Sequence, residues 1–101
     1  MNPPDTRRNK MTTPTKFQLG RLLITPNAQQ SLHPTDVYQS LNRHGLGNWG
    51  DCDEEDWERN EEALEHELRI FSVYHDRTGV KFWIITEADR ASTTVLLPSD
   101  Y

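Results

Sequence analysis

The sequence predicts a small α+β domain in which helices pack on one face of an antiparallel sheet. Three observations predict it. The chain has 101 residues, enough for one domain. Its last third holds three apolar segments separated by short turns, and its middle third holds two segments with helical spacing. We expect residues 17–101 to form this domain, and residues 1–16, which are rich in Pro, Thr and basic residues, to be a disordered arm.

The first expected elements are a strand and two helical segments. Apolar residues alternate over residues 17–25, which predicts the strand. Thr25 followed by Pro26 is typical of a helix start, so a short helical turn is expected over residues 26–32. His33 and Pro34 start a longer helix that ends at Gly45. Its apolar stripe is expected to contain Val37, Tyr38, Leu41 and His44.

The second long helix is acidic. Asp51 or Asp53 is expected to cap it, and more carboxylates fill its first turn, where the helix dipole favours negative charge. Residues 51–67 hold ten acids and one Arg, a net charge of -9, whereas the whole chain carries -5. We expect Trp57, with Leu64 and Leu68, to anchor this helix in the core, and Trp49 to be a second anchor. The charged faces are expected either to be solvated or to dock a basic protein in place of nucleic acid phosphates.

The C-terminal third is expected to be a three-stranded meander over residues 68–75, 80–87 and 92–98. Residues 76–79 fit a type I turn followed by Gly in a left-handed bulge position. This turn sets His75 opposite Lys81 and Val73 opposite Trp83, and the same register sets Arg69 opposite Glu87. The second turn then sets Trp83 opposite Leu96. Side chains alternate between the two faces of a sheet, so this register assigns every residue of the meander to a face.

The two faces differ in character. One carries no charge and is expected to be the core face: Leu68, Ile70, Ser72, Tyr74, Val80, Phe82, Ile84, Thr86, Thr93, Val95 and Leu97. The other has an apolar middle around Phe71 and Trp83 and a rim of Arg69, His75, Lys81 and Glu87. An apolar patch with a polar rim is typical of a binding surface. The alternative is that a helix or the N-terminal strand covers this second face.

Two functions fit the second face. The preferred one is protein binding through Phe71, Trp83, Lys81, Arg69 and Glu87. The alternative is a ribonuclease-like toxin, in which Glu87 is the base, His75 the acid, and Arg69 or Lys81 neutralises the phosphate. A cross-strand ion pair between Arg69 and Glu87 would also explain those two residues.

Several classes of site are not expected. No Gly-rich phosphate loop is present, the four histidines lack ligand spacing, and Asp56 stands where a calcium loop needs Gly. We therefore expect no cofactor and no metal. No stretch is apolar enough for a membrane span or an N-terminal signal, and Cys52 is the only cysteine, so a reduced cytoplasmic setting is expected.

Residues 17–101 resemble a widespread group of small, uncharacterised bacterial proteins encoded on plasmids and other mobile elements. The stretches that carry the resemblance are FQLGRLLITPNA at 17–28, RHGLGNWGD at 43–51 and FWIITEADRASTTVLLPSDY at 82–101. The group usually has Gly-Asp-Trp-Gly where this chain has Asn48 between Gly47 and Trp49. The resemblance implies a bacterial cytoplasmic protein of accessory genes and assigns no site.

Together these observations predict a non-enzymatic interaction or regulatory module of mobile-element type. A protein partner is expected, either another protein or a second copy of the chain as a homodimer. Nucleic acid binding through the second sheet face stays as the alternative, and no membrane association is expected.

Overall fold

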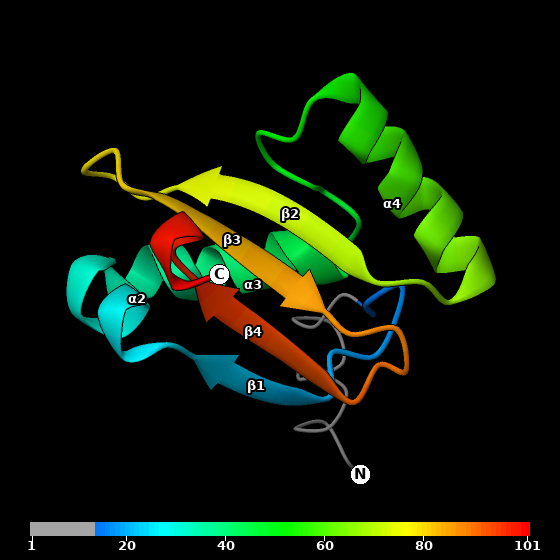
Figure 1. Cartoon of the computed structure of the whole chain (residues 1–101), viewed down its shortest axis with the longest axis horizontal. Helices are drawn as coiled ribbons and strands as arrows, with labels where there is room; N and C mark the ends of the chain where they lie inside the picture. Colours follow the sequence, from blue (N-terminus) through cyan, green and yellow to red (C-terminus); the bar gives the residue numbers. More distant parts are fainter. Residues whose placement is uncertain (1–13) are drawn as a thin grey trace, which may run out of the picture.

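The computed structural model describes residues 14–101 and has the expected α+β architecture (Figure 1). Its elements, in chain order, are β1 (Arg21–Ile24), α2 (Pro26–Ser31), α3 (Pro34–Gly45), α4 (Glu54–His66), β2 (Ile70–His75), β3 (Lys81–Thr86), β4 (Ser92–Leu96) and the short 3-10 helix η1 (Pro98–Asp100). The expected disordered arm lies mostly outside the described residues. At its end, the Lys16 N–H donates to the Gly45 carbonyl at 2.8 Å.

The sheet is mixed, with the strand order β1-β4-β3-β2. β3 is antiparallel to both of its neighbours, whereas β1 runs parallel to β4 at one edge. In Figure 1, α3 lies behind the sheet and η1 in front of it, while α4 lies beyond the outer edge of β2. The two faces of the sheet are therefore covered by different elements.

The register predicted from the turns is confirmed. Val73 lies opposite Trp83, His75 opposite Lys81, and Trp83 opposite Leu96. The turn that sets it has the expected form, because Gly79 has a φ of 90° and its N–H donates to the Asp76 carbonyl at 2.8 Å. Short turns thus fix the meander, and with it the assignment of residues to faces.

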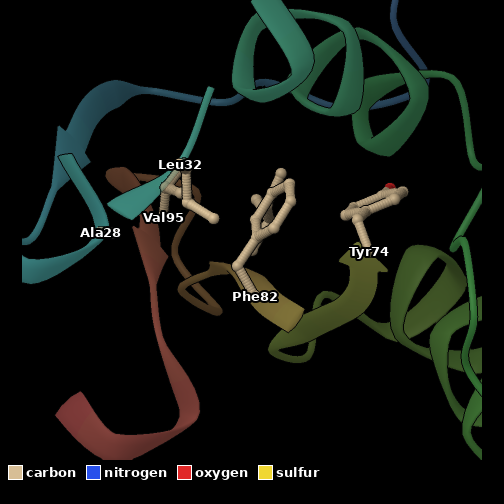
Figure 2. Packing of buried hydrophobic residues seen from close by; sticks show 6 residues of the cluster. Ala28, Leu32, Tyr74, Phe82 and Val95 are labelled. Atoms are coloured by element: carbon tan, nitrogen blue, oxygen red, sulfur yellow. The ribbon is translucent and has the colours of Figure 1, made fainter. Parts of the chain in front are cut away.

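The main core lies between the sheet and helices α2 and α3. Tyr74, Phe82 and Val95 of the strands form one buried cluster with Ala28 of α2 and Leu32, the residue after it (Figure 2). The core face is buried along most of its length, as predicted. Leu68 is an exception, since it precedes β2 and is 50% exposed.

The caps predicted from the sequence start the helices. The Thr25 hydroxyl accepts from the Ala28 N–H at 3.2 Å, and the Asp53 carboxylate accepts from the Asp56 N–H at 2.8 Å. Each cap satisfies a backbone donor that the first turn of a helix leaves without a partner. Asp53, rather than Asp51, is therefore the cap of α4.

The orientation of two aromatic residues differs from the prediction. Trp49 is buried and packs with Ala63 and Ile70, as expected. Trp57 is 36% exposed, because α4 turns Asn60 and Ala63 toward the sheet instead. Tyr38 of the expected α3 stripe is also exposed, at 67%.

Candidate functional site

Three aromatic rings meet on the second face of the sheet. Phe71 of β2 and Trp83 of β3 pack edge to face, with ring centroids 5.1 Å apart. Tyr101 adds a third ring, 5.8 Å from Trp83 and again edge to face. Such edge-to-face pairs stabilise each other beyond their burial.

Tyr101 reaches Trp83 because η1 turns the chain back over the sheet. The Asp100 carboxylate fixes this turn by accepting hydrogen bonds from the Thr25 hydroxyl at 2.6 Å, the Asn27 amide at 2.8 Å and the Leu97 N–H at 3.0 Å. These donors, the Thr25 hydroxyl first, lower the pKa of Asp100. The carboxylate is therefore ionised at neutral pH and holds η1 against the start of α2.

A pocket of about 330 Å³ opens between these rings and the start of α4. Its apolar floor comes from the sheet and the chain end, and its polar wall from α4 and Arg69. The lining residues are Asp56, Arg59, Asn60, Arg69, Phe71, Trp83, Ile85 and Tyr101.

Asn60 fixes the position of the α4 wall. Its side-chain amide donates to the Phe71 carbonyl and accepts from the Phe71 N–H, the latter at 3.0 Å. Both backbone groups point outward from β2, the edge strand, so Asn60 satisfies them as a neighbouring strand would. Because Asn60 is 3% exposed, the contact is shielded from water, and it holds α4 beside the pocket.

Arg69 lines the pocket and pairs with Glu87, which lies outside the lining. Their side chains make the predicted cross-strand ion pair at 3.4 Å, and Arg69 also donates to the Tyr101 hydroxyl at 2.8 Å. The hydrogen bond to Tyr101 is the main reason why the pKa of Arg69 is raised. Both side chains of the pair are nearly half exposed, so we expect it to orient Tyr101 more than to stabilise the fold.

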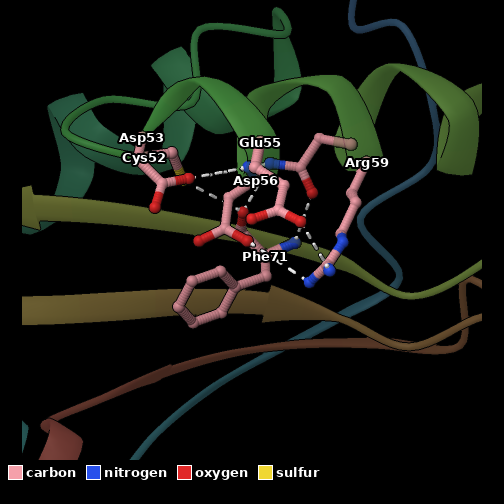
Figure 3. Close-up of polar contacts among 7 residues, drawn as sticks. Cys52, Asp53, Glu55, Asp56, Arg59 and Phe71 are labelled. Atoms are coloured by element: carbon pink, nitrogen blue, oxygen red, sulfur yellow. Dashed lines mark hydrogen bonds and ion pairs between the residues drawn. The ribbon is translucent and has the colours of Figure 1, made fainter.

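Arg59 connects the pocket to the acidic surface of α4. It pairs with Glu55 at 3.2 Å and with Asp56 at 3.7 Å, beside Phe71 (Figure 3). A second, shallow hollow on α4 also contains Arg59 and is lined by carboxylates: Glu55, Glu58, Glu61, Glu62 and Glu65, with His66. Glu54–His66 holds seven acids and one Arg, a net charge of -6. The aromatic pocket and the acidic hollow therefore form one surface that is continuous through Arg59.

His75 and Lys81 lie at the opposite end of the strand pair from Arg69 and Glu87. They face each other across β2 and β3, and His75 Nδ1 contacts the Asp51 carboxylate at 2.8 Å. Arg69 and His75 are six positions apart along extended chain, which corresponds to about 20 Å. The structure thus gathers Phe71, Trp83, Arg69 and Glu87 in one place but leaves Lys81 apart. It does not bring Glu87, His75 and Arg69 together, as the ribonuclease alternative requires.

Tyr101, Asn60, Asp56 and Arg59 belong to the pocket but were not among the residues predicted from the sequence. Pro98 and Asp100 carried a usable signal for Tyr101, because they indicate that the chain turns after β4. Asn60 is the one amide side chain in a mostly acidic helix. That contrast could have marked it as a residue that does not face solvent.

The other chemically capable side chains have structural roles. His44 is fully buried and its two ring nitrogens contact the Ser72 and Thr86 hydroxyls, while burial lowers its pKa to about 3. Burial raises the pKa of Cys52 to about 11, so its thiol stays protonated at neutral pH. Among residues 14–101, no group of three or more His, Cys, Asp or Glu side chains is arranged to hold a metal ion.

Asn48, in the loop between α3 and α4, makes two side-chain hydrogen bonds. Its side-chain oxygen accepts from Arg43 at 3.2 Å and from the Gly50 N–H at 3.1 Å. An Asp carboxylate can accept both hydrogen bonds. Asn48 therefore holds the loop around Trp49 and Gly50, and an Asp at this position would keep that role.

No helix within residues 14–101 has the length and apolar character that crossing a membrane requires. Comparison of the chain with protein-family models, with curated proteins and with solved structures finds no match. The assignment of a function therefore depends on the geometry of this surface.

Proposed function

We propose that this chain is a non-enzymatic protein-interaction module that binds a basic segment of a partner protein. One observation carries the proposal: Arg59 lines both the aromatic pocket and the acidic hollow. A partner segment can therefore place an apolar side chain over Trp83 while its neighbouring residues follow α4. In this proposal the second sheet face and the acidic helix form one binding site.

The chemistry of the two parts defines the partner segment. The pocket presents Phe71, Trp83 and Tyr101 inside a polar rim, the arrangement in which a few buried aromatic contacts dominate binding energy. The net charge of -6 on α4 attracts Lys and Arg and repels acidic segments and nucleic acid. The expected partner segment thus has one large apolar residue flanked by basic residues.

We further propose a bacterial cytoplasmic setting and an accessory gene of a plasmid or another mobile element. The resemblance of residues 17–28, 43–51 and 82–101 supports this setting. The ribonuclease alternative has no comparable support, because about 20 Å separates His75 from the Arg69 and Glu87 pair.

The test is selection of binding peptides from a random phage-displayed library on the immobilised chain. We expect enrichment of peptides with one large apolar residue next to Lys or Arg, with affinity that falls as salt rises. Tyr101→Ala and Trp83→Ala should each weaken the selected peptides at least about tenfold, which corresponds to a hot-spot loss of about 1.4 kcal/mol or more.

Trp57→Ala is the matched control, because Trp57 is a partly exposed tryptophan of α4 that does not line the pocket. Tyr101 is 71% exposed, so its removal leaves the fold intact even if Trp83→Ala perturbs the sheet. Enrichment of acidic peptides, or binding that is equally strong in the Tyr101 and Trp57 variants, would refute the proposed site.

A further inference from the structure

The two edge strands of the sheet, β2 and β1, differ in whether their outward backbone groups have partners among the residues that the structure describes. On the β2 edge, Asn60 pairs with the N–H and C=O of Phe71, and the segment around Gly50 pairs with Val73. The Val73 N–H donates to the Trp49 carbonyl at 3.2 Å, and the Asp51 N–H donates to the Val73 carbonyl at 2.7 Å. The outward backbone groups of Phe71 and Val73 in β2 are therefore satisfied within the chain.

The β1 edge has no such cover among residues 14–101. Arg21 and Thr25 donate their N–H groups to β4 and the residue before it, at 2.9 Å to Ala91 and 3.0 Å to Val95. Alternate residues of a strand direct their backbone groups to opposite sides, so Leu22 and Ile24 direct theirs away from β4. Leu22 is 55% exposed, Leu23 42% and Ile24 38%. An apolar edge strand without Pro or a bulge is a template for pairing with another strand.

We propose that β1 pairs antiparallel with β1 of a second copy of this chain, joining the two sheets across a two-fold axis. The outward groups of Leu22 and Ile24 fix the register. The N–H and C=O of Leu22 pair with those of the partner's Ile24, and symmetry repeats these bonds. Leu23 then faces the partner's Leu23 on the axis. This interface is self-complementary, as a two-fold dimer requires, and it is independent of the aromatic pocket.

Apolar side chains are buried on both sides of the joined sheet. Leu22 and Ile24 lie beside Thr93 and Val95, which places them on the core face. Leu23 lies beside Thr94 on the second face. Pairing of two β1 strands therefore covers all three exposed apolar residues of the edge at once.

Charge complementarity supports the same register. It places the partner's Arg21 directly opposite Thr25, about 4.5 Å away between Cα atoms. Thr25 donates to Asp100 Oδ2, and the ionised Asp100 carboxylate keeps one acceptor position free on Oδ1 beside Asn27. The partner's Arg21 side chain is long enough to reach this carboxylate, and the symmetric pair forms at the other end of the interface.

The oligomeric state of the full chain in solution tests the proposal. Sedimentation equilibrium at about 100 µM should give twice the monomer mass. Leu23→Lys should raise the dissociation constant at least about tenfold, because it sets two like charges opposite each other on the axis. Leu46→Lys, at a leucine that is 38% exposed after α3, is the matched control and should leave the dimer unchanged.

A cysteine variant tests the register. In a Cys52→Ser background, Leu23→Cys should form a disulfide-linked dimer on mild oxidation, since facing residues of this type of pair lie close enough for a disulfide. Leu46→Cys should not. A wild-type monomer at about 100 µM, or a dimer that survives Leu23→Lys without Leu23→Cys cross-linking, would overturn the proposal.

Discussion

His44 is a polar residue in the core of this small domain, and both of its ring nitrogens have hydrogen-bonding partners. Its imidazole contacts the hydroxyls of Ser72 and Thr86, and Thr86 in turn contacts Thr93 at 2.7 Å. The Thr93 hydroxyl contacts the Leu19 carbonyl at 2.6 Å, so the chain of contacts links α3, the sheet and the segment before β1. Protonation of His44 would place a charge in the buried core, and this burial lowers its pKa to about 3.

We expect acid to destabilise the fold through His44. The pKa of the folded state, about 3, lies below the ordinary value of 6.5, so between these values the unfolded chain binds a proton that the folded chain does not. The free energy of unfolding therefore falls as pH falls through this window, by about 2 kcal/mol between pH 7 and pH 5.

Urea denaturation of the wild type and of His44→Gln at both pH values measures this effect. Gln keeps hydrogen-bonding capacity but does not titrate. The stability difference between the two proteins should therefore shrink by about 2 kcal/mol at pH 5. A stability difference between the two proteins that is the same at pH 7 and pH 5 would show that His44 has the same pKa in the folded and unfolded states.

Arg90, in the charged turn after the apolar strand β3, has a structural role. Its backbone has a φ of 62°, and its guanidinium donates to the carbonyls of Leu68 at 2.7 Å and Ala63 at 2.9 Å. These carbonyls lie at and beyond the C-terminal end of α4, where the helix dipole favours positive charge. Arg90 therefore ties the turn between β3 and β4 to the end of α4.

At the scale of elements, α4 is held by a hydrogen-bonded side chain as much as by an apolar stripe. Its buried residues are Asn60 and Ala63, and Trp57 turns toward solvent. This arrangement suits a helix that covers a strand edge, because an edge offers backbone groups rather than apolar side chains.

Asn60→Ala should therefore destabilise the protein more than its small volume change suggests. It leaves the N–H and C=O of Phe71 without partners, and we expect a loss of about 2 kcal/mol or more in the free energy of unfolding. Asn60→Asp should cost more than Ala at pH 7, because it brings a buried charge against the Phe71 carbonyl. Glu62→Ala, on the exposed face, should change stability by less than about 0.5 kcal/mol.

Hydrogen exchange separates this local effect from general unfolding. In Asn60→Ala the Phe71 amide should exchange faster than the loss of global stability explains. The Ile84 amide in the sheet centre should exchange at the rate that global stability sets. Equal loss at both amides would mean that α4 and the sheet open only together.

At the scale of the whole molecule, charge is distributed so that one edge is strongly negative. The segment 51–67 carries -9 and the remainder of the chain +4. Glu54, Glu58 and Glu62 follow one another at four-residue spacing on α4, an arrangement that destabilises a helix. This repulsion is a stability cost of the surface that we propose binds a basic partner.

Glu58→Lys should therefore stabilise the fold and weaken the proposed function. It converts two repulsive pairs, with Glu54 and Glu62, into attractive ones, for an expected gain of about 0.5–1 kcal/mol in thermal or urea denaturation at low salt. The same change should lower affinity for basic peptides. A gain that persists unchanged at about 1 M salt would argue against electrostatic repulsion as its cause.

The sequence by itself determined the local features of this protein. Short turns and strict alternation set the register of β2, β3 and β4, so Trp83, Phe71 and the Arg69–Glu87 pair could be placed on one face. Caps such as Thr25 and Asp53 set the starts of the helices. These features depend on residues a few positions apart, where backbone geometry leaves few choices.

Only the tertiary structure decided the features that join distant segments. β1 pairs in parallel with β4, Tyr101 lies on Trp83, and Asn60 rather than Trp57 faces the sheet. No turn connects these partners directly, so their pairing depends on which arrangement satisfies the edge of β2 and buries the most apolar surface. A helical wheel cannot show that the edge of β2 requires an amide, and for that reason the wall of the candidate site appeared only in the folded chain.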